Sequence, residues 1–232
     1  SDCFIKEMLV SLAAQTCTAF DLVILNDGVE NLIEFVDAYA PLIKVIEVHV
    51  DKSPVKNREY GINYCIKSGY QKLIFGDSDD WFCDNRVECS INCLEKFDIV
   101  VNDLALVTET GEVRHNYFSS RLDNYSLIEY NFIKNKNIFG LTNTGIRLDN
   151  IEPVFLPDDA IAVDWYFFAT MLVKRKSAIF VSDTQTYYRQ HADNLIGLGN
   201  PSTENLAFVQ DVRRAHRKLM KAFLRQHQDF KT

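Results

Sequence analysis

In the first third of the chain, segments with apolar residues at helical spacing alternate with short continuous apolar runs. Between Phe4 and Ala14 the apolar residues recur at helical spacing, which predicts an amphipathic helix. Residues 20–27, FDLVILND, form a short apolar run before a glycine, which predicts a buried strand and then a loop. The alternation continues with helices expected at 32–39 and 58–68, strands at 44–50 and 71–76, and a polar loop at 51–54. This order predicts a parallel sheet covered by helices on both faces.

The pattern changes in the second half, where strand-like runs lie closer together. We expect helices near 85–96, 125–136, 164–174 and 205–227, and strands at 97–108, 112–118, 141–148 and 178–191. Gly111 separates two of these strands and predicts a turn between them. There is no internal repeat and no clear linker, so one α/β domain over residues 1–227 is the simplest description.

Composition supports a packed domain and argues against some partners. The chain has 232 residues, of which 47% are hydrophobic, enough for a sizeable core. Its net charge of -7 argues against nucleic acid as a partner, since phosphate neutralisation needs clustered cations. The sequence shows no signal peptide and no apolar stretch of about 18 residues. Six scattered cysteines without a zinc-type spacing favour reduced thiols and a cytoplasmic location.

Candidate chemistry lies at the carboxyl ends of two predicted strands. One strand ends in Asn26-Asp27-Gly28 and another in Asp77-Ser78-Asp79-Asp80, and in an open α/β sheet such loops converge on a ligand site. Three neighbouring carboxylates repel one another unless a cation compensates, and carboxylate oxygens favour Mg²⁺ or Mn²⁺. A diphosphate would complete the shell of such an ion. The competing interpretation is that the cluster only caps the next helix, for which one Asp would suffice.

Five segments, in order, resemble the family 2 glycosyltransferases of the A-type fold. They are SLAAQTCTAFDLVILNDG at 11–28, REYGI at 58–62, LIFGDSDDWF at 73–82, VDWY at 163–166 and YRQHADN at 188–194. The resemblance implies a Rossmann-like, mostly parallel sheet with helices on both faces and a mixed acceptor-side half. It divides the chain into a nucleotide-binding half at 1–100, an acceptor-side half at 101–200 and a basic helix at 201–227. The family's first strand has no counterpart in this sequence.

The resemblance also implies roles for the donor-side residues. Asp27 would accept a hydrogen bond from the nucleobase, and Arg58 would position the ribose or the diphosphate. Asp79 would contact the ribose, the metal or both, and Asp80 would be the more direct metal ligand. Asp77 would shape the loop. For Arg58, a solvated surface cation is the competing interpretation.

Later in the chain the resemblance implies a catalytic base. Asp164 would take the proton from the acceptor hydroxyl, and a single displacement would invert the anomeric centre. His191 would lie near the diphosphate or the metal, with Arg189 adding positive charge. Without the resemblance, Asp164 is better explained as a first-turn carboxylate favoured by the helix dipole. Trp165 is expected either in the core or stacked on an acceptor sugar.

These implications define the expected partners. The donor would be a nucleotide sugar, with UDP-sugars favoured, used with Mn²⁺ or Mg²⁺, and the acceptor a glycan or a lipid-linked glycan. The basic amphipathic helix at 205–227 could lie on an anionic membrane, placing the protein at the inner face of that membrane, or it could pack on its own domain. A non-catalytic nucleotide-sugar-binding homologue is the alternative, since Val163 stands where the family commonly has Glu.

Overall fold

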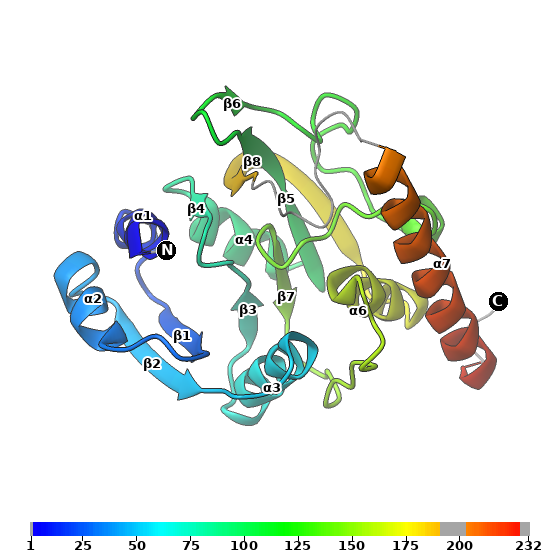
Figure 1. The fold of residues 1–232 in the computed structure, drawn as a ribbon, viewed down its shortest axis with the longest axis horizontal. Coiled ribbons are helices and arrows are strands. Elements are labelled where there is room, and N and C mark those ends of the chain that lie inside the picture. Colours follow the sequence, from blue (N-terminus) through cyan, green and yellow to red (C-terminus); the bar gives the residue numbers. More distant parts are fainter. Residues whose placement is uncertain (1, 191–202, 228–232) are drawn as a thin grey trace.

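The computed structural model describes residues 2–190 and 203–227 as helices packed around two sheets (Figure 1). Its helices are α1 (Asp2–Ala13), α2 (Leu32–Tyr39), α3 (Pro54–Lys67), α4 (Arg86–Leu94), α5 (Tyr130–Ile133), α6 (Val163–Val173) and α7 (Thr203–Gln226). Its strands are β1 (Asp21–Asn26), β2 (Lys44–His49), β3 (Lys72–Ile74), β4 (Trp81–Phe82), β5 (Ile99–Val107), β6 (Val113–Arg114), β7 (Thr144–Arg147) and β8 (Ala178–Arg189).

The two sheets differ in how their strands pair. Strands β1 and β2 form a parallel pair of their own, while the larger sheet has the order β3-β7-β5-β8-β4, with β6 added to β5. In the larger sheet β5 and β8 are parallel and the other pairs are antiparallel. The α/β class is therefore confirmed, with more antiparallel pairing than the sequence pattern predicted. Because β3 and β4 pair with β7 and β8, the expected halves 1–100 and 101–200 share one sheet.

The main core lies around β5 and α6. All nine residues of β5 are buried, as expected for a strand covered on both faces. Helix α6 is apolar around almost its whole circumference, and nine of its 11 residues are buried because α7 and the other residues of the main core surround it. A second, smaller core joins α1 and α2 to the β1–β2 pair, with Leu9 and Val36 among its most buried side chains.

The prediction of a helix at 125–136 is mostly wrong. Only Tyr130–Ile133 is helical, because the preceding residues pair alongside β8. Tyr125 has a left-handed backbone with φ of 61°, and Leu127 forms an antiparallel bridge with Ile179. The amide of Ile128 also donates to the carbonyl of Ala178 at 2.9 Å. Long-range pairing thus overrides a helical apolar pattern.

Two boundaries were also wrong in ways that local chemistry explains. The loop expected at 51–54 ends earlier, since Ser53 caps α3 by accepting from the Lys56 amide, and Pro54 occupies the first helical position. The strand expected at 112–118 is only two residues long, and both residues are exposed. Phe118, at the end of the segment predicted as this strand, is buried in the core instead, where its ring packs edge-on against Phe180.

Helix α7 packs on its own domain, the second of the two interpretations. Val212 and Met220 are each 2% exposed on the side that faces the core, and the arginines and lysines of the helix lie on the exposed side. None of the helices that the structure describes is both long and apolar enough to cross a membrane.

Candidate active site

The acidic loop at 77–80 connects β3 to β4 and is fastened to the end of β8. Trp81 and Phe82 pair antiparallel with Tyr187 and Thr186, and the rings of Trp81 and Tyr187 stack with centroids 5.1 Å apart. Within the loop, the Asp80 amide donates to the carbonyl of Asp77 at 3.3 Å. This pairing brings the loop beside the last residues of β8, about 110 positions later in the sequence.

Arg189, the last residue of β8, holds the loop in three ways. Its backbone amide donates to Asp80 Oδ1 at 2.8 Å, and its Nε donates to the carbonyl of Asp79 at 2.9 Å. Its guanidinium also lies over the rings of Phe4 and Trp81 and pairs with Glu7 on α1. Arg189 therefore anchors the acidic loop to β8 and to the first helix.

Asp80 is a fully buried carboxylate with an unused acceptor. It is 0% exposed, and its Oδ2 has no hydrogen-bond partner among the described residues. The Thr142 hydroxyl lies nearby without forming a well-aligned bond. Burial raises the pKa of Asp80 to about 7, against the opposing effects of Thr142 and the Arg189 amide, and the charges of Asp79 and Asp77 add to the rise. A buried carboxylate left this way is poised to gain from a cation.

Arg86, in the first turn of α4, supplies positive charge behind the loop. It is 2% exposed, and it donates to the carbonyls of Phe75 and Thr142 at 2.6 Å each and to Asn102 Oδ1 at 3.1 Å. Burial lowers the pKa of Arg86 to about 9, while the charges of Asp80 and Asp77 act to raise it. At neutral pH it remains a cation that offsets part of the charge of the loop.

Asp164 enters the site from the first turn of α6. Its Oδ1 accepts from the Trp165 amide at 2.8 Å, and its Oδ2 accepts from Asn137 Nδ2 at 3.1 Å. Burial raises the pKa of Asp164 to about 6 against the lowering effects of the Trp165 amide, Arg58 and Asn137, and Asp77 raises it further. A carboxylate with this pKa is ionised at neutral pH and remains a better proton acceptor than an ordinary Asp.

Arg58 and Tyr188 connect the acidic loop to Asp164. The positive charge of Arg58 lowers the pKa of both Asp77 and Asp164, although burial raises both overall. Burial raises the pKa of the Tyr188 hydroxyl, and the loop carboxylates and Asp164 raise it further. Three elements distant in sequence, α3, β8 and α6, thus place Arg58, Tyr188 and Asp164 close enough to the loop carboxylates for their charges to interact.

Asp27 lies at the carboxyl end of β1, next to α3. It is exposed, and its Oδ2 lies 3.5 Å from Asn57 Nδ2, one residue before Arg58. Asn26 is buried instead: its side chain bonds both the amide and the carbonyl of Val29 at 2.7 Å, so it shapes the loop that presents Asp27. His191, the remaining predicted site residue, lies outside the described residues.

Three contributing residues escaped the sequence analysis, each for a different reason. Arg86 follows a predicted loop and resembles any surface arginine at a helix start. Asn137 falls in a segment wrongly expected to be helical. Tyr188 lies within the YRQHADN segment, so its position in that motif was a usable signal. Trp165 is 4% exposed, and its ring stacks on His216. The expectation that Trp165 packs in the core is therefore confirmed, and the alternative, stacking on an acceptor sugar, is wrong.

The donor set suits a hard divalent cation that shares its shell with phosphate. Asp79 is partly exposed, and the buried Oδ2 of Asp80 has no hydrogen-bond partner among the described residues, so the available ligands are carboxylate oxygens. Among the described residues, no group of three or more His, Cys, Asp or Glu side chains is arranged to hold a metal. Two carboxylates suffice for Mg²⁺ or Mn²⁺ where phosphate oxygens and water supply the other ligands.

Comparisons with known proteins identify a family for most of the chain and structures of similar fold. The family described as "Glycosyl transferase family 2" matches residues 2–151, and no curated protein matches the chain. Among solved structures, S. aureus TarS 1-349 in complex with UDP-GlcNAc is 18% identical with a TM-score of 0.63, over 91% of this chain and 62% of that one. GalNAc-T7 with UDP, GalNAc and Mn²⁺ is 11% identical with a TM-score of 0.56, over 88% of this chain and 44% of that one.

The S. aureus TarS structure with the longer chain gives the same result. It is 17% identical with a TM-score of 0.61, over 92% of this chain and 41% of that one. This chain therefore spans less than two thirds of the length of the TarS and GalNAc-T7 chains that it resembles. At these identities the likeness concerns the fold, and it confirms the fold class expected from the sequence.

Proposed function

The chain belongs to glycosyl transferase family 2, and from this premise we propose that it transfers a sugar from a nucleotide-sugar donor to a hydroxyl group. One observation carries the proposal: the acidic loop, Arg58 and Asp164 come from separate elements, yet the charge of Arg58 acts on both Asp77 and Asp164, and lowers the pKa of each. A UDP-sugar is the proposed donor. The solved complexes of TarS with UDP-GlcNAc and of GalNAc-T7 with UDP support this choice.

The donor binds, in this proposal, along the edge formed by β1, α3 and the acidic loop. Asp27 is exposed at the end of β1 and accepts a hydrogen bond from the base. Arg58 supplies positive charge toward the diphosphate. Asp79 and Asp80 would hold Mn²⁺ or Mg²⁺, and His191 would be a further ligand. Arg189 contributes to donor binding by keeping the loop in place.

Asp164 is the proposed general base. Asn137 and the Trp165 amide fix its carboxylate, and its raised pKa suits proton transfer at neutral pH. It takes the proton from the acceptor hydroxyl as that oxygen attacks the anomeric carbon. The nucleoside diphosphate leaves from the opposite side of the ring, so the configuration at the anomeric carbon is inverted. When bound, the divalent cation offsets the charge on the departing diphosphate.

The acceptor is proposed to be a glycan or a lipid-linked glycan. The exposed cationic face of α7 is compatible with an anionic membrane surface. A peripheral position at the inner face of the membrane, reached from the cytoplasm, would bring a lipid-linked acceptor to the enzyme.

Donor hydrolysis tests the proposal without knowledge of the acceptor. The protein is incubated with Mn²⁺ and a panel of UDP-, GDP- and dTDP-sugars, and release of the nucleoside diphosphate is measured. We expect slow hydrolysis of a UDP-sugar, and Asp164→Asn should reduce it by about 10²-fold or more while UDP binding persists. Asp149→Asn removes a carboxylate that is exposed on the surface, so it serves as the matched control.

Two outcomes would redirect the proposal. Unchanged hydrolysis in Asp164→Asn would remove this residue from the role of base. Binding of UDP without hydrolysis of any donor would favour the alternative, a homologue that binds nucleotide sugars without catalysis.

A further inference from the structure

The segment between β7 and α6 is held by side chains of α3 as a neighbouring strand would hold it. It passes beside α3 before it enters α6 (Figure 1). Residues 151–157 belong to no helix or strand, so their backbone amides and carbonyls need partners from elsewhere. Val154 and Leu156 find these partners on one face of α3.

Three side chains of α3 bond both backbone groups of each of these two residues. Asn63 Oδ1 accepts from the Val154 amide at 2.7 Å, and Asn63 Nδ2 donates to the Val154 carbonyl at 2.8 Å. The Leu156 amide donates to Glu59 Oε2 at 2.6 Å, and Lys56 Nζ donates to the Leu156 carbonyl at 2.9 Å. Lys56 also donates to Glu59 at 2.8 Å, so these two side chains act as one unit. We call Lys56, Glu59 and Asn63 the α3 clamp.

The spacing of the α3 clamp matches that of an extended chain. Glu59 and Asn63 are four residues apart, which corresponds to about 6 Å along a helix axis. Val154 and Leu156 are two residues apart, which corresponds to about 6.6 Å in an extended chain. Between them Phe155 points away and is 74% exposed, whereas the side chain of Leu156 is buried in the core. The α3 clamp therefore fixes the register of the segment as well as its position.

The clamped segment leads directly to the proposed base. Leu156 is eight residues before Asp164, and the turn between them is closed by the Ala160 amide, which donates to the Pro157 carbonyl at 3.0 Å. Helix α6 follows, with Asp164 in its first turn. A different face of α3 carries Arg58, whose charge acts to lower the pKa of Asp164. One helix thus holds both the segment that carries the base and the cation assigned to the diphosphate.

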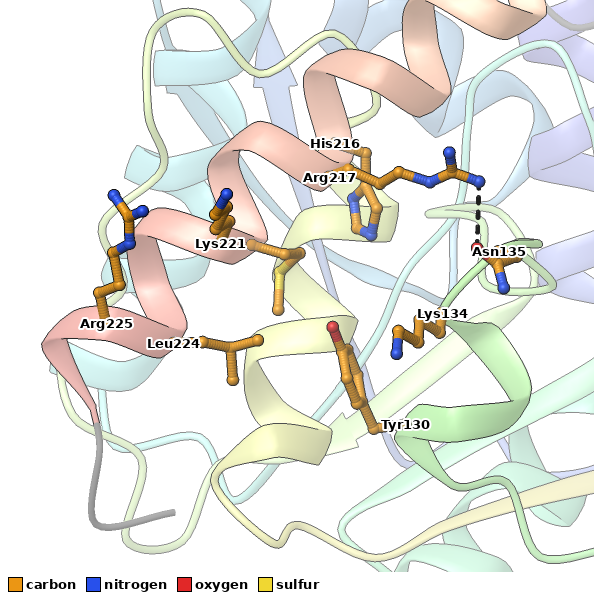
Figure 2. Close-up of a pocket in the computed structure, with 9 residues that line it drawn as sticks. Tyr130, Lys134, Asn135, His216, Arg217, Lys221, Leu224 and Arg225 are labelled. Carbon is orange, nitrogen blue, oxygen red and sulfur yellow. Dashed lines mark hydrogen bonds between the residues drawn. The ribbon is translucent and has the colours of Figure 1, made fainter. Parts of the chain in front are cut away.

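A separate set of contacts holds the base from the α5 segment. Asn137 donates to Asp164 Oδ2 at 3.1 Å. Two residues earlier, Asn135 accepts from Arg217 of α7 at 3.1 Å, a bond drawn in Figure 2. None of these contacts involves α3 or the clamped segment, so the two supports of the base can be tested separately.

We infer that Glu59 and Asn63 are positioning residues for Asp164, and that the α3 clamp keeps this base at a fixed place relative to Arg58. They act through the backbone of the segment and not through contact with the substrate. A displacement of about 1 Å between a base and the group that it serves can lower a rate on the order of 10²-fold. The inference rests on the proposed function, in which Asp164 is the base, and it adds the residues that place it.

Donor hydrolysis by Asn63→Ala and Glu59→Ala tests the inference. Both variants leave Asp164 and its direct hydrogen-bond donors unchanged. We expect kcat for a UDP-sugar with Mn²⁺ to fall about tenfold or more in each, while KM for the donor changes less than about twofold. Glu59→Gln keeps an acceptor for the Leu156 amide and should recover most of kcat. The matched control, Lys67→Gln, changes an exposed residue at the end of α3 outside the clamp and should behave as the wild type does.

Two readouts distinguish positioning from a general loss of structure. The acidic limb of the pH-rate profile should move to lower pH in the Ala variants, because burial is the largest cause of the raised pKa of Asp164 and a looser segment exposes it. Hydrogen exchange of the Trp165 amide, which donates to Asp164, should become about tenfold faster while the amides of β5 keep their wild-type rates. The exchange measurement needs no activity.

The inference fails if exchange at Trp165 is unchanged in the Ala variants, or if the amides of β5 change equally, because the loss is then global. It also fails if the wild type hydrolyses a donor and kcat stays the same in both Ala variants. If the wild type hydrolyses no donor, the proposed function fails, and exchange at Trp165 alone decides whether the α3 clamp holds Asp164 in place.

Discussion

Replacing Asp80 by Asn should stabilise the protein while removing its response to a divalent cation. The asparagine has the same shape, its Oδ1 can still accept from the Arg189 amide, and its Nδ2 would face the Thr142 hydroxyl. What the change removes is a negative charge at a position that is 0% exposed. A gain in stability together with a loss of cation binding would show that the charge of Asp80 serves binding and not folding.

The magnitude follows from the pKa of the buried carboxyl. Burial raises it from 3.8 to about 7, so between these values the folded protein holds a proton that the unfolded chain has lost. Stability therefore falls as pH rises through this window, by about 1.4 kcal/mol for each pH unit, and the ionised carboxylate costs up to about 4 kcal/mol above pH 7. This cost already includes the opposing effect of the Arg189 amide, which favours the ionised form of the carboxyl.

Thermal or urea unfolding of both proteins across this pH range measures the effect. Near pH 4 the two proteins should be equally stable. At about pH 8 the Asn variant should be more stable by roughly 3–4 kcal/mol, or roughly 8–14 °C in Tm. Mn²⁺ should raise the Tm of the wild type and leave the variant unchanged. A variant that is less stable at every pH would refute the reasoning, as would a difference that does not depend on pH.

Three other predictions concern the neighbours of this residue. The rate of donor hydrolysis should fall about tenfold for each pH unit below about pH 6, since Asp164 must lose its proton to act as base, and a pH-rate profile measures this. Asn137→Ala should move that acidic limb to higher pH by removing a donor to the Asp164 carboxylate; an unmoved limb would exclude Asn137 as its positioning residue. Arg86→Met should destabilise the fold by roughly 3–5 kcal/mol in urea unfolding, because it leaves the buried carboxylates without their counter-charge; a smaller loss than about 1 kcal/mol would contradict that role.

Sequence patterns predicted the elements that rely on local chemistry. The run at 20–27 contains β1, and the run at 178–191 contains β8 up to Arg189, since both are rich in the branched and aromatic residues that favour strands. The acidic loop, Arg58 and Asp164 were identified through collinear motifs, and the structure brings them together. Local propensity and motif order were sufficient for these positions.

The remainder depends on contacts between distant residues. The segment before Tyr130 is helical in pattern, yet it pairs alongside β8, and no local feature reveals that partner. Arg86 is buried only because Phe75, Asn102 and Thr142 converge around it from three other segments. Helix α7 covers α6, and this pairing depends on two segments that neither helix encodes alone.

Calorimetric titration with UDP tests the central claim most directly. The account predicts measurable binding with Mn²⁺, a loss of about tenfold or more when the cation is removed, and a similar loss with the cation present in Asp79→Asn and Asp80→Asn. The control variant Asp149→Asn should bind as the wild type does. Binding of UDP that is independent of the cation and survives both loop variants would contradict the account, because the acidic loop would then not be the donor site.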